Sequence, residues 1–244
     1  AAVILGLLCS AKHEIHFERD MSLRPDWNMI RNIMSVGIPN GVENSLFQLG
    51  KILMLSLISS FGTASIAANA IANNFAQYQI LGGMSVGIAM VTVVSQCVGA
   101  GDYEKVRRYT RKLMKLSYLF IVIMVIVTLA LMPLILRLYN VSAEADAYAV
   151  RCILLHGGMA CLIWPMAFTL PNTLRAAGDA RYTMVVSVLV MWAVRIGCGY
   201  LLGAYFGLGI LGVWIAMILD WAVRIPFFLL RYRGSRWEHM SLVH

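Results

Sequence analysis

The stretch LSYLFIVIMVIVTLALMPLIL, residues 116–136, contains no charged side chain along its whole length. A helix of about 20 residues crosses the hydrocarbon core of a bilayer, so this stretch is long enough to span a membrane. Similar runs recur, such as YTMVVSVLVMWAV at 182–194, and they lack the strict alternation of barrel strands. Because only helices and closed barrels satisfy their backbone hydrogen bonds in lipid, the sequence predicts an all-α fold, a polytopic membrane helix bundle.

Composition agrees with this class, since 60% of the residues are hydrophobic and only 13% are charged. In a soluble domain about a quarter of the residues are charged. Six complete transmembrane helices are predicted, at roughly 33–58, 64–98, 114–138, 145–175, 180–204 and 210–231. Gly82 and Gly83 favour a kink or break in the second of them, and Pro165 and Pro171 favour a bend or an early end in the fourth.

The first residues, AAVILGLLCSA, are apolar but follow neither an initiating Met nor a basic region, so they do not resemble a signal peptide. We interpret residues 1–11 as the end of a truncated transmembrane helix that precedes the six complete ones. The expected organisation is then a cytoplasmic connector at 12–32, a six-helix transmembrane lobe at 33–231 and a cytoplasmic tail at 232–244. On this interpretation the chain is a fragment of a longer protein.

Lysine and arginine are distributed unevenly between the predicted loops. They cluster before the first complete span, between the second and third, between the fourth and fifth, and in the tail, whereas the other loops hold only Arg137. By the positive-inside rule the basic loops and the C-terminus are cytoplasmic, which predicts a multi-pass protein of the plasma (inner) membrane. The cluster KVRRYTRKLMK (105–115) then faces anionic lipid, and the net charge of +8 needs no nucleic-acid partner.

The first predicted span opens with an unusually polar stretch, GIPNGVENSLFQLGK at 37–51. On a helix its polar and small residues occupy one arc of about 140°, interrupted by Phe47, while apolar residues occupy the opposite side. The polar members are Asn40, Glu43, Asn44, Gln48 and Lys51. This helix is therefore expected to present one face to lipid and the other to protein or water.

The second span repeats this pattern with three amides. Asn69, Asn73 and Gln77 follow each other at i, i+4 and i+8, which places them on one stripe of the helix. Two interpretations remain open. The amides can brace the bundle through hydrogen bonds between helices, or they can line a cavity for a solute.

Charged residues inside spans are stronger signals, because each costs about 2.5–3.5 kcal/mol near the bilayer centre on insertion scales. The last two spans form an antiparallel hairpin around residues 203–209, which places Arg195 and Asp220 at a similar depth. Arg224 follows Asp220 at i+4, on the same face. The sequence therefore predicts an ion-pair cluster of Arg195, Asp220 and Arg224, acting either as a permanent link between the helices or as a gate or relay.

Glu43 has no basic residue at i+3 or i+4, and Lys51 lies about 12 Å further along the helix axis. A carboxylate held away from water can take up a proton or a sodium ion reversibly. Glu43 is therefore our candidate for a cation-binding residue, with a structural glutamate as the alternative. His156, in LLHGGMA, is interpreted as a buried histidine rather than a proton carrier.

Nothing predicts an enzyme, a metal site or a cofactor. The sequence has no H-E-x-x-H motif and no phosphate-binding glycine-rich loop. Its five cysteines lie in apolar segments without the spacing of metal ligands, so we interpret them as small hydrophobic residues of the helix packing.

Several motifs, in this order along the chain, resemble the MATE family of multidrug and toxic compound extrusion transporters. They are GIPNGVENSLFQLGK, SIAANAIANNFAQ, VVSQCVGAGDYEKVRRYTRK, LRAAGDARYTM and GVWIAMILDWAVR. The resemblance implies an antiporter of two six-helix lobes that exports cationic or amphipathic compounds in exchange for H⁺ or Na⁺. This chain would then be the second lobe, with a missing N-terminal lobe and membrane lipid as its partners.

The resemblance also bears on the coupling site. Some family members use an acidic residue in the first helix of this lobe, and Glu43 is similar in kind although it lies about one turn nearer the proline. Others use an aspartate of the first lobe. Three alternatives remain. One is a lipid-linked saccharide flippase of related fold, favoured by Lys51, Arg195 and Arg224; the others are a non-transporting membrane scaffold subunit and a half-sized chain working as a homodimer.

Overall fold

The computed structural model of this chain describes residues 26–239, without the side chains of residues 32, 36, 39, 40 and 239. The predicted truncated helix at 1–11 and most of the predicted connector at 12–32 therefore lie outside the described residues. The chain divides into a unit of residues 1–35 and a unit of residues 36–244, and all the packing described below belongs to the second.

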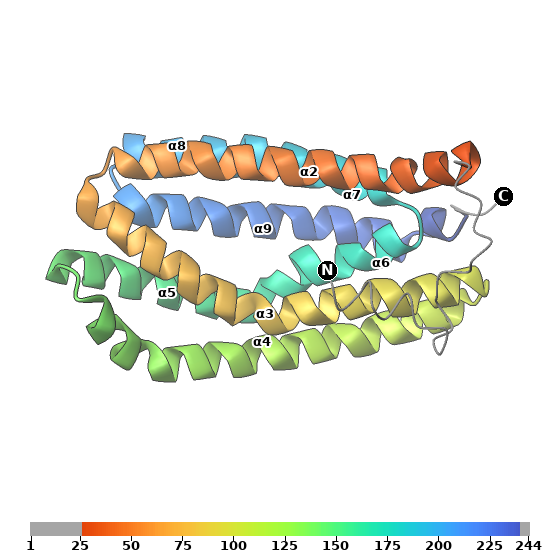
Figure 1. The fold of residues 1–244 in the computed structure, drawn as a ribbon, viewed down its shortest axis with the longest axis horizontal. Helices are drawn as coiled ribbons and strands as arrows, with labels where there is room; N and C mark the ends of the chain where they lie inside the picture. Colours follow the sequence, from red (N-terminus) through yellow and green to blue (C-terminus); the bar gives the residue numbers. More distant parts are fainter. Residues whose placement is uncertain (1–25, 240–244) are drawn as a thin grey trace, which may run out of the picture. The chain divides into compact units, whose positions relative to one another are not determined.

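The described part of the chain is helical (Figure 1). Its α-helices are α2 (Trp27–Ser59), α3 (Thr63–Gly99), α4 (Tyr103–Tyr139), α5 (Ala143–Trp164), α6 (Leu170–Ala176), α7 (Ala180–Val190), α8 (Gly197–Tyr200) and α9 (Gly209–Arg233). Three π-helical segments are η1 (Pro165–Thr169), η2 (Met191–Ile196) and η3 (Leu201–Tyr205), and a 3₁₀ turn, η4, covers Arg236–His239. The π segments join α5 to α6 and α7 to α8, so each pair forms one long helix.

Within residues 26–239, five helices are long and apolar enough to cross a membrane. They are Thr63–Gly99, Tyr103–Tyr139, Ala143–Ala176, Ala180–Tyr205 and Gly209–Arg233. This confirms the predicted all-α membrane bundle. The first predicted span is also helical, within α2, which begins at Trp27 rather than near residue 33. It is not among the five, and its sequence contains the polar stretch at 37–51.

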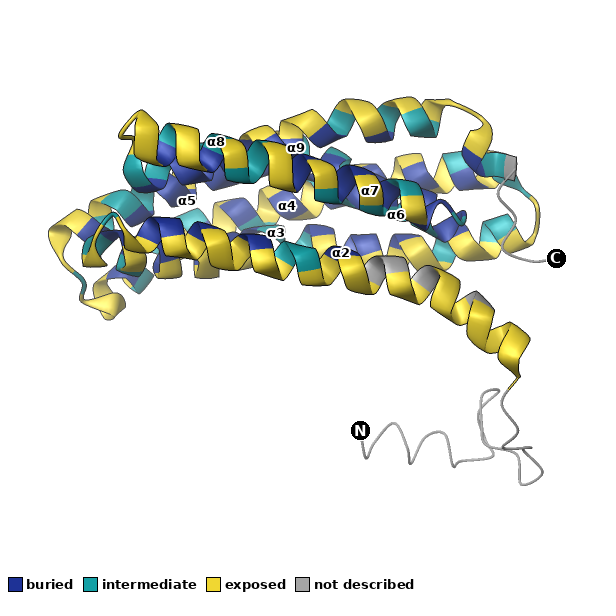
Figure 2. Ribbon diagram, turned by 90° about the horizontal axis from the view of Figure 1, so that it is seen from above, coloured by how far each residue is buried: buried dark blue, intermediate teal, exposed yellow. Residues whose placement is uncertain are grey.

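Large apolar side chains remain exposed on the described helices. Ile88, Ile126 and Leu162 are 72%, 61% and 65% exposed, respectively. Figure 2 shows such exposed positions recurring beside buried ones along the helices. So many exposed large apolar side chains are unfavourable in water, whereas in a bilayer they contact lipid tails.

The Gly82–Gly83 pair does not break α3, which is helical without interruption although its ribbon changes direction along its length (Figure 1). A Cβ atom on Gly82 would lie 2.7 Å from Cβ of Phe120, and one on Gly83 would lie 2.5 Å from Cζ3 of Trp164. The two glycines therefore allow α3 to pack closely against α4 and α5. The helix is therefore not broken at this pair, a kink there stays a prediction, and the contacts of the two glycines are those of close packing.

The prolines of the fourth span do not end it early. Pro165 opens the π segment η1, and the helix continues through Pro171 to Ala176. A proline supplies no backbone N–H and crowds the preceding turn. A widened π turn accommodates such an irregularity without ending the helix.

The predicted tail at 232–244 contains more structure than expected. After α9 ends at Arg233, Trp237 of η4 is fully buried. Its ring stacks on Tyr232 and meets Tyr103 edge-on, with ring centroids 5.7 and 6.0 Å apart. Arg107 of α4 also binds Glu238 at 2.6 Å. These contacts hold the segment after α9 against the start of α4.

Replacing Gly212 by Ala is expected to lower the free energy of unfolding by about 1–3 kcal/mol. A Cβ atom at this position would lie 2.6 Å from both the backbone N of Gly203 and the backbone C of Leu202, and backbone atoms cannot rotate away. The matched control is Gly158→Ala, where a Cβ would meet nothing within 4 Å. Thermal unfolding of the full-length protein in detergent compares the two. A Gly212→Ala protein as stable as the control would contradict this packing.

Candidate functional site

A cavity of about 500 Å³ opens within the bundle, between α2, α3, α5, η1, α6, η2 and α9. Its lining combines charged and amide groups with aromatic rings. The charged and polar members are Glu43, Asn44, Lys51, Asn73, Gln77, His156, Asn172, Arg175 and Arg195. The aromatic members are Phe47, Trp164, Phe168 and Trp221. A smaller cavity of about 220 Å³ shares Lys51, Asn73 and Arg195 with it. Polar groups from distant parts of the sequence thus meet in one hollow.

Some of the predicted amide side chains line a cavity, and one of them also forms a hydrogen bond between helices. Asn44, Asn73 and Gln77 line the larger cavity. Asn69 lines the smaller one and accepts a hydrogen bond from Nε1 of Trp214 at 3.3 Å, which links α3 to α9. Gln48 is exposed and lines neither cavity. The side chain of Asn40 lies outside the described residues.

Glu43 has a basic partner that the sequence did not reveal. Nη2 of Arg175 donates to both carboxylate oxygens of Glu43, at 2.7 and 2.9 Å, and Nη1 donates to Oδ1 of Asn172 at 3.2 Å. Glu43 is only 8% exposed. The prediction considered partners on the same helix, whereas Arg175 comes from α6, 132 residues further along the chain. Spacing along α2 alone therefore could not indicate this partner.

Arg175 itself is not fully satisfied. Its Nε is buried and has no hydrogen-bond partner in the described part of the chain. A buried donor without an acceptor costs about 1–3 kcal/mol, so an acceptor such as water or a bound solute is favoured there. Arg175 was expected in a basic loop, but its guanidinium instead reaches the cavity beside Glu43.

Asp220 and Arg224 form the bonded part of the predicted cluster. Nε and Nη2 of Arg224 donate to Oδ1 of Asp220 at 2.9 and 2.8 Å, and Nη2 also donates to Oδ2 at 3.0 Å. The guanidinium lies over the rings of Phe47 and Phe168, at 4.9 and 5.6 Å from their centroids. Both side chains are buried, so carboxylate and rings together replace water around this cation.

Arg195 lies close enough to Asp220 and Arg224 to interact with their charges, but it is bonded to neither. It makes no hydrogen bond or ion pair to Asp220, or to any other side chain that the structure describes, and it lines both cavities instead. It belongs to η2, and π segments are often found at functional sites. Within the predicted cluster, Asp220 and Arg224 are thus bonded to each other, while Arg195 interacts with them by charge alone and faces the cavities.

His156 is a buried, hydrogen-bonded residue, as interpreted from the sequence. Its Nδ1 lies 2.6 Å from Oε1 of Gln79, and its ring meets Trp214 and Trp221 edge-on. Gln79, which the sequence reasoning did not single out, is fully buried. Its spacing from the predicted amide stripe places it on a neighbouring face of α3, so the stripe alone could not indicate it.

The charges around the cavity do not balance. Glu43 and Arg175 neutralise each other, while Lys51 and Arg195 have no carboxylate within ion-pair distance among the residues described. In surroundings of low dielectric constant, such charges interact more strongly with a ligand than they would in water. The cavity can therefore hold a molecule that combines a polar or negative group with apolar surface.

Residues 83–87, GMSVG, match the G-x-S-x-G pattern of serine hydrolases. In those enzymes the serine occupies a sharp turn between a strand and a helix. Here Ser85 lies within α3, and its hydroxyl donates to the carbonyl of Leu81 at 3.0 Å. The match therefore gives no support to a hydrolase.

Comparison with known families and proteins gives a consistent result. The sequence model of the MatE family matches residues 39–201. The probable multidrug resistance protein YoeA of Bacillus subtilis is 25% identical over 91% of this chain and 48% of its own length. The probable multidrug resistance protein NorM of Thermotoga maritima is 25% identical over 99% of this chain and 52% of its own. The chain thus spans about half the length of these relatives.

Solved structures share the fold. An outward-facing multidrug resistance MATE transporter of the MOP superfamily superposes with a TM-score of 0.84 at 18% identity, over 97% of this chain and 53% of that one. A MOP superfamily transporter from Pyrococcus furiosus, whose reversed pocket polarity suggests a different function, gives 0.74 at 22% identity, over 84% and 45%. At these identities the likeness is one of architecture.

Proposed function

Since this chain belongs to the MATE family, we propose that it is one half of a secondary antiporter that exports amphipathic drugs or toxins in exchange for H⁺ or Na⁺. The family is one of transporters and not of enzymes. The observation that carries the proposal is the cavity of about 500 Å³, in which charged and amide groups from α2, α3, α6 and η2 meet aromatic rings inside a membrane bundle. Ionisable groups inside a membrane bundle are energetically costly, and they commonly mark the pathway of a solute or a coupling ion.

The other half is a required partner in this proposal. YoeA and NorM are about twice as long as the matched region, and this chain corresponds to about half of each. A substrate site at the interface of two related halves is typical of secondary transporters. We place the basic loops and the C-terminus in the cytoplasm, as the positive-inside rule predicts.

Glu43 remains our candidate for the coupling residue, with Arg175 as its competitor. Both carboxylate oxygens of Glu43 accept from Arg175 in this structure, so a proton or Na⁺ can bind fully only when that pair opens. Uptake of the cation would release Arg175, and loss of the cation would restore the pair. Two conformations that differ in this contact would couple ion binding to movement of α6 against α2.

A second candidate function depends on whether the substrate is a cation or an anion. The rings of Trp164, Phe168 and Trp221 suit an amphipathic molecule and can contact an organic cation. Lys51 and Arg195, however, repel a cation and attract an anion. This observation favours, as the second candidate, a carrier of anionic substrates such as a flippase for lipid-linked saccharides.

Efflux from intact cells tests the proposal. The full-length protein is expressed in bacteria that lack their own drug exporters, and accumulation of a cationic and an anionic fluorescent dye is measured. We expect lower accumulation of at least one dye, and loss of that effect when the H⁺ and Na⁺ gradients are collapsed. Unchanged accumulation of both dyes would contradict drug export.

Charge selectivity is measured in the same cells. Replacing Lys51 and Arg195 together by Gln is expected to reduce efflux of an anionic dye and to leave or improve efflux of a cationic one. Arg151→Gln combined with Arg137→Gln is the matched control, because it removes two positive charges that line neither cavity. Equal effects of the two double variants would contradict a role of the cavity charges.

A further inference from the structure

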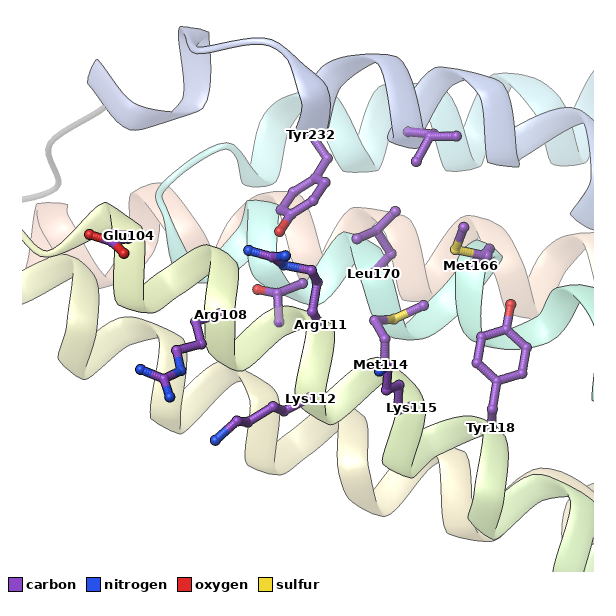
Figure 3. A pocket seen from close by; sticks show the side chains of 12 residues that line it. Glu104, Arg108, Arg111, Lys112, Met114, Lys115, Tyr118, Met166, Leu170 and Tyr232 are labelled. Atoms are coloured by element: carbon purple, nitrogen blue, oxygen red, sulfur yellow. The ribbon is translucent and has the colours of Figure 1, made fainter.

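A third hollow lies between α4, the η1–α6 segment and α9, and shares no lining residue with the two cavities described above. It is a groove of about 650 Å³ (Figure 3). Its lining residues are Glu104, Arg108, Thr110, Arg111, Lys112, Met114, Lys115, Tyr118, Met166, Leu170, Leu229 and Tyr232. The proposed transport function makes no use of this groove.

One edge of the groove is strongly basic. Arg108, Arg111, Lys112 and Lys115 are all exposed and recur at spacings of three and four residues, which places them on one face of α4. Glu104 is the only acidic residue in the lining. In Figure 3 the guanidinium of Arg111 extends across the groove towards the hydroxyl of Tyr232.

These four cations differ from their neighbours on the same helix. Lys105 binds Asp102 at 2.8 Å, and Arg107 binds Glu238 at 2.6 Å. No carboxylate of the described chain lies within ion-pair distance of the four residues that line the groove. The same helical turns thus contain cations paired with a carboxylate of the protein and cations without such a counter-charge among the described residues, and the latter line the groove.

The floor of the groove is apolar. Met114 and Leu170 are buried, and Met166 and Leu229 are partly buried beside them. Tyr118 marks the far end, about 15 Å from Arg108 along the axis of α4. From there α4 continues into the uncharged stretch at 116–136, which forms the most apolar of the five membrane spans. The groove therefore passes from a basic edge to a membrane-embedded apolar floor.

We propose that this groove binds an anionic phospholipid, with the phosphate-bearing head group beside Arg111 and Tyr232 and an acyl chain along Met114, Met166 and Leu170. Arginine and lysine form strong charge-assisted hydrogen bonds with phosphate oxygens. Basic pockets between membrane helices on the cytoplasmic side are suited to anionic head groups. A soluble phosphate compound or a nucleic acid would leave the apolar floor unused. The bound lipid would connect α4 to α9 across the groove and stabilise the folded state.

Lipid binding is tested on the intact full-length protein in detergent, by native mass spectrometry and by thermal unfolding. The probes are phosphatidylglycerol and phosphatidylcholine with identical acyl chains, and glycerol phosphate as a soluble head group. We expect phosphatidylglycerol to remain bound and to raise the unfolding temperature, and the other two to do neither. Equal binding of phosphatidylcholine, or equal stabilisation by glycerol phosphate, would overturn the proposal.

Substitutions of the basic groove residues test whether the lipid binds in the groove. Arg108→Gln, Arg111→Gln and Lys115→Gln together are expected to weaken phosphatidylglycerol binding on the order of a hundredfold. The matched control is Arg137→Gln, Arg151→Gln and Arg233→Gln, which removes the same charge at positions outside the groove. An equal loss in both triple variants would overturn the assignment. If the groove variant does not fold, Arg111→Gln alone provides the same comparison with Arg233→Gln. The outcome does not depend on whether the protein exports drugs.

Discussion

Replacing Asp220 by Asn is expected to cost about 3–5 kcal/mol of folding free energy, because it leaves a buried guanidinium without its counter-charge. Arg224 is 1% exposed and Asp220 is fully buried. All three hydrogen bonds to the guanidinium nitrogens of Arg224 are accepted by this one carboxylate. The two aromatic rings over the guanidinium attract it but cannot neutralise it.

The measurement is the yield of folded protein and its unfolding temperature in detergent, with Glu144→Gln as a control at an exposed carboxylate. Replacing Asp220 and Arg224 together by Leu should restore much of the lost stability, because no buried charge then remains. These results would identify the pair as a permanent link. An Asp220→Asn protein that folds normally but transports nothing would instead identify a relay or gate.

Replacing Glu43 by Gln is expected to reduce ion-coupled export to the level of cells without the protein. Gln has nearly the same shape and can still accept a hydrogen bond from Arg175, but it cannot carry the negative charge that binds a proton or Na⁺. Export driven by imposed H⁺ and Na⁺ gradients is measured in proteoliposomes, with Glu144→Gln again as the control. Unchanged export with the same ion dependence would contradict the assignment.

Substituting Arg175, the partner of Glu43, distinguishes a role of Glu43 in ion coupling from a role in stabilising the fold. If the ion pair only holds α6 to α2, Glu43→Gln combined with Arg175→Gln removes both charges and should recover export lost in the single variants. If Glu43 binds the coupling ion, the double variant stays inactive while its unfolding temperature recovers. Comparing the two readouts therefore decides between the two roles.

Sequence periodicity and hydropathy were sufficient to predict the helices, because the formation of each membrane span depends on its local composition. The Asp220–Arg224 pair could be predicted for the same reason, since i and i+4 are neighbours on any helix. Arg175 could not be predicted, because its contact with Glu43 depends on how α6 packs against α2. The same limit applies to Arg195, because whether it bonds to Asp220 depends on how η2 packs against α9.

π turns account for the remaining differences between the predicted and the observed helices. The sequence offered Pro165 as the end of a helix, but a π turn accommodates it, and nothing local marks the π segments η2 and η3. Each π turn contains more residues than an α turn, so side chains beyond it are displaced from a regular helical pattern. Arg195 lies within such a segment, η2, whereas the amide stripe of α3 lies on a regular α-helix.

The modest hydropathy of α2 has a consequence for biogenesis. An isolated segment partitions from the translocon into lipid according to its summed insertion energy, and the charges of Glu43 and Lys51 oppose that step. Only residues 60–62 separate α2 from the more apolar α3. We therefore expect these two helices to enter the bilayer together as a hairpin, so that the least apolar helix is inserted only once its successor has been synthesised.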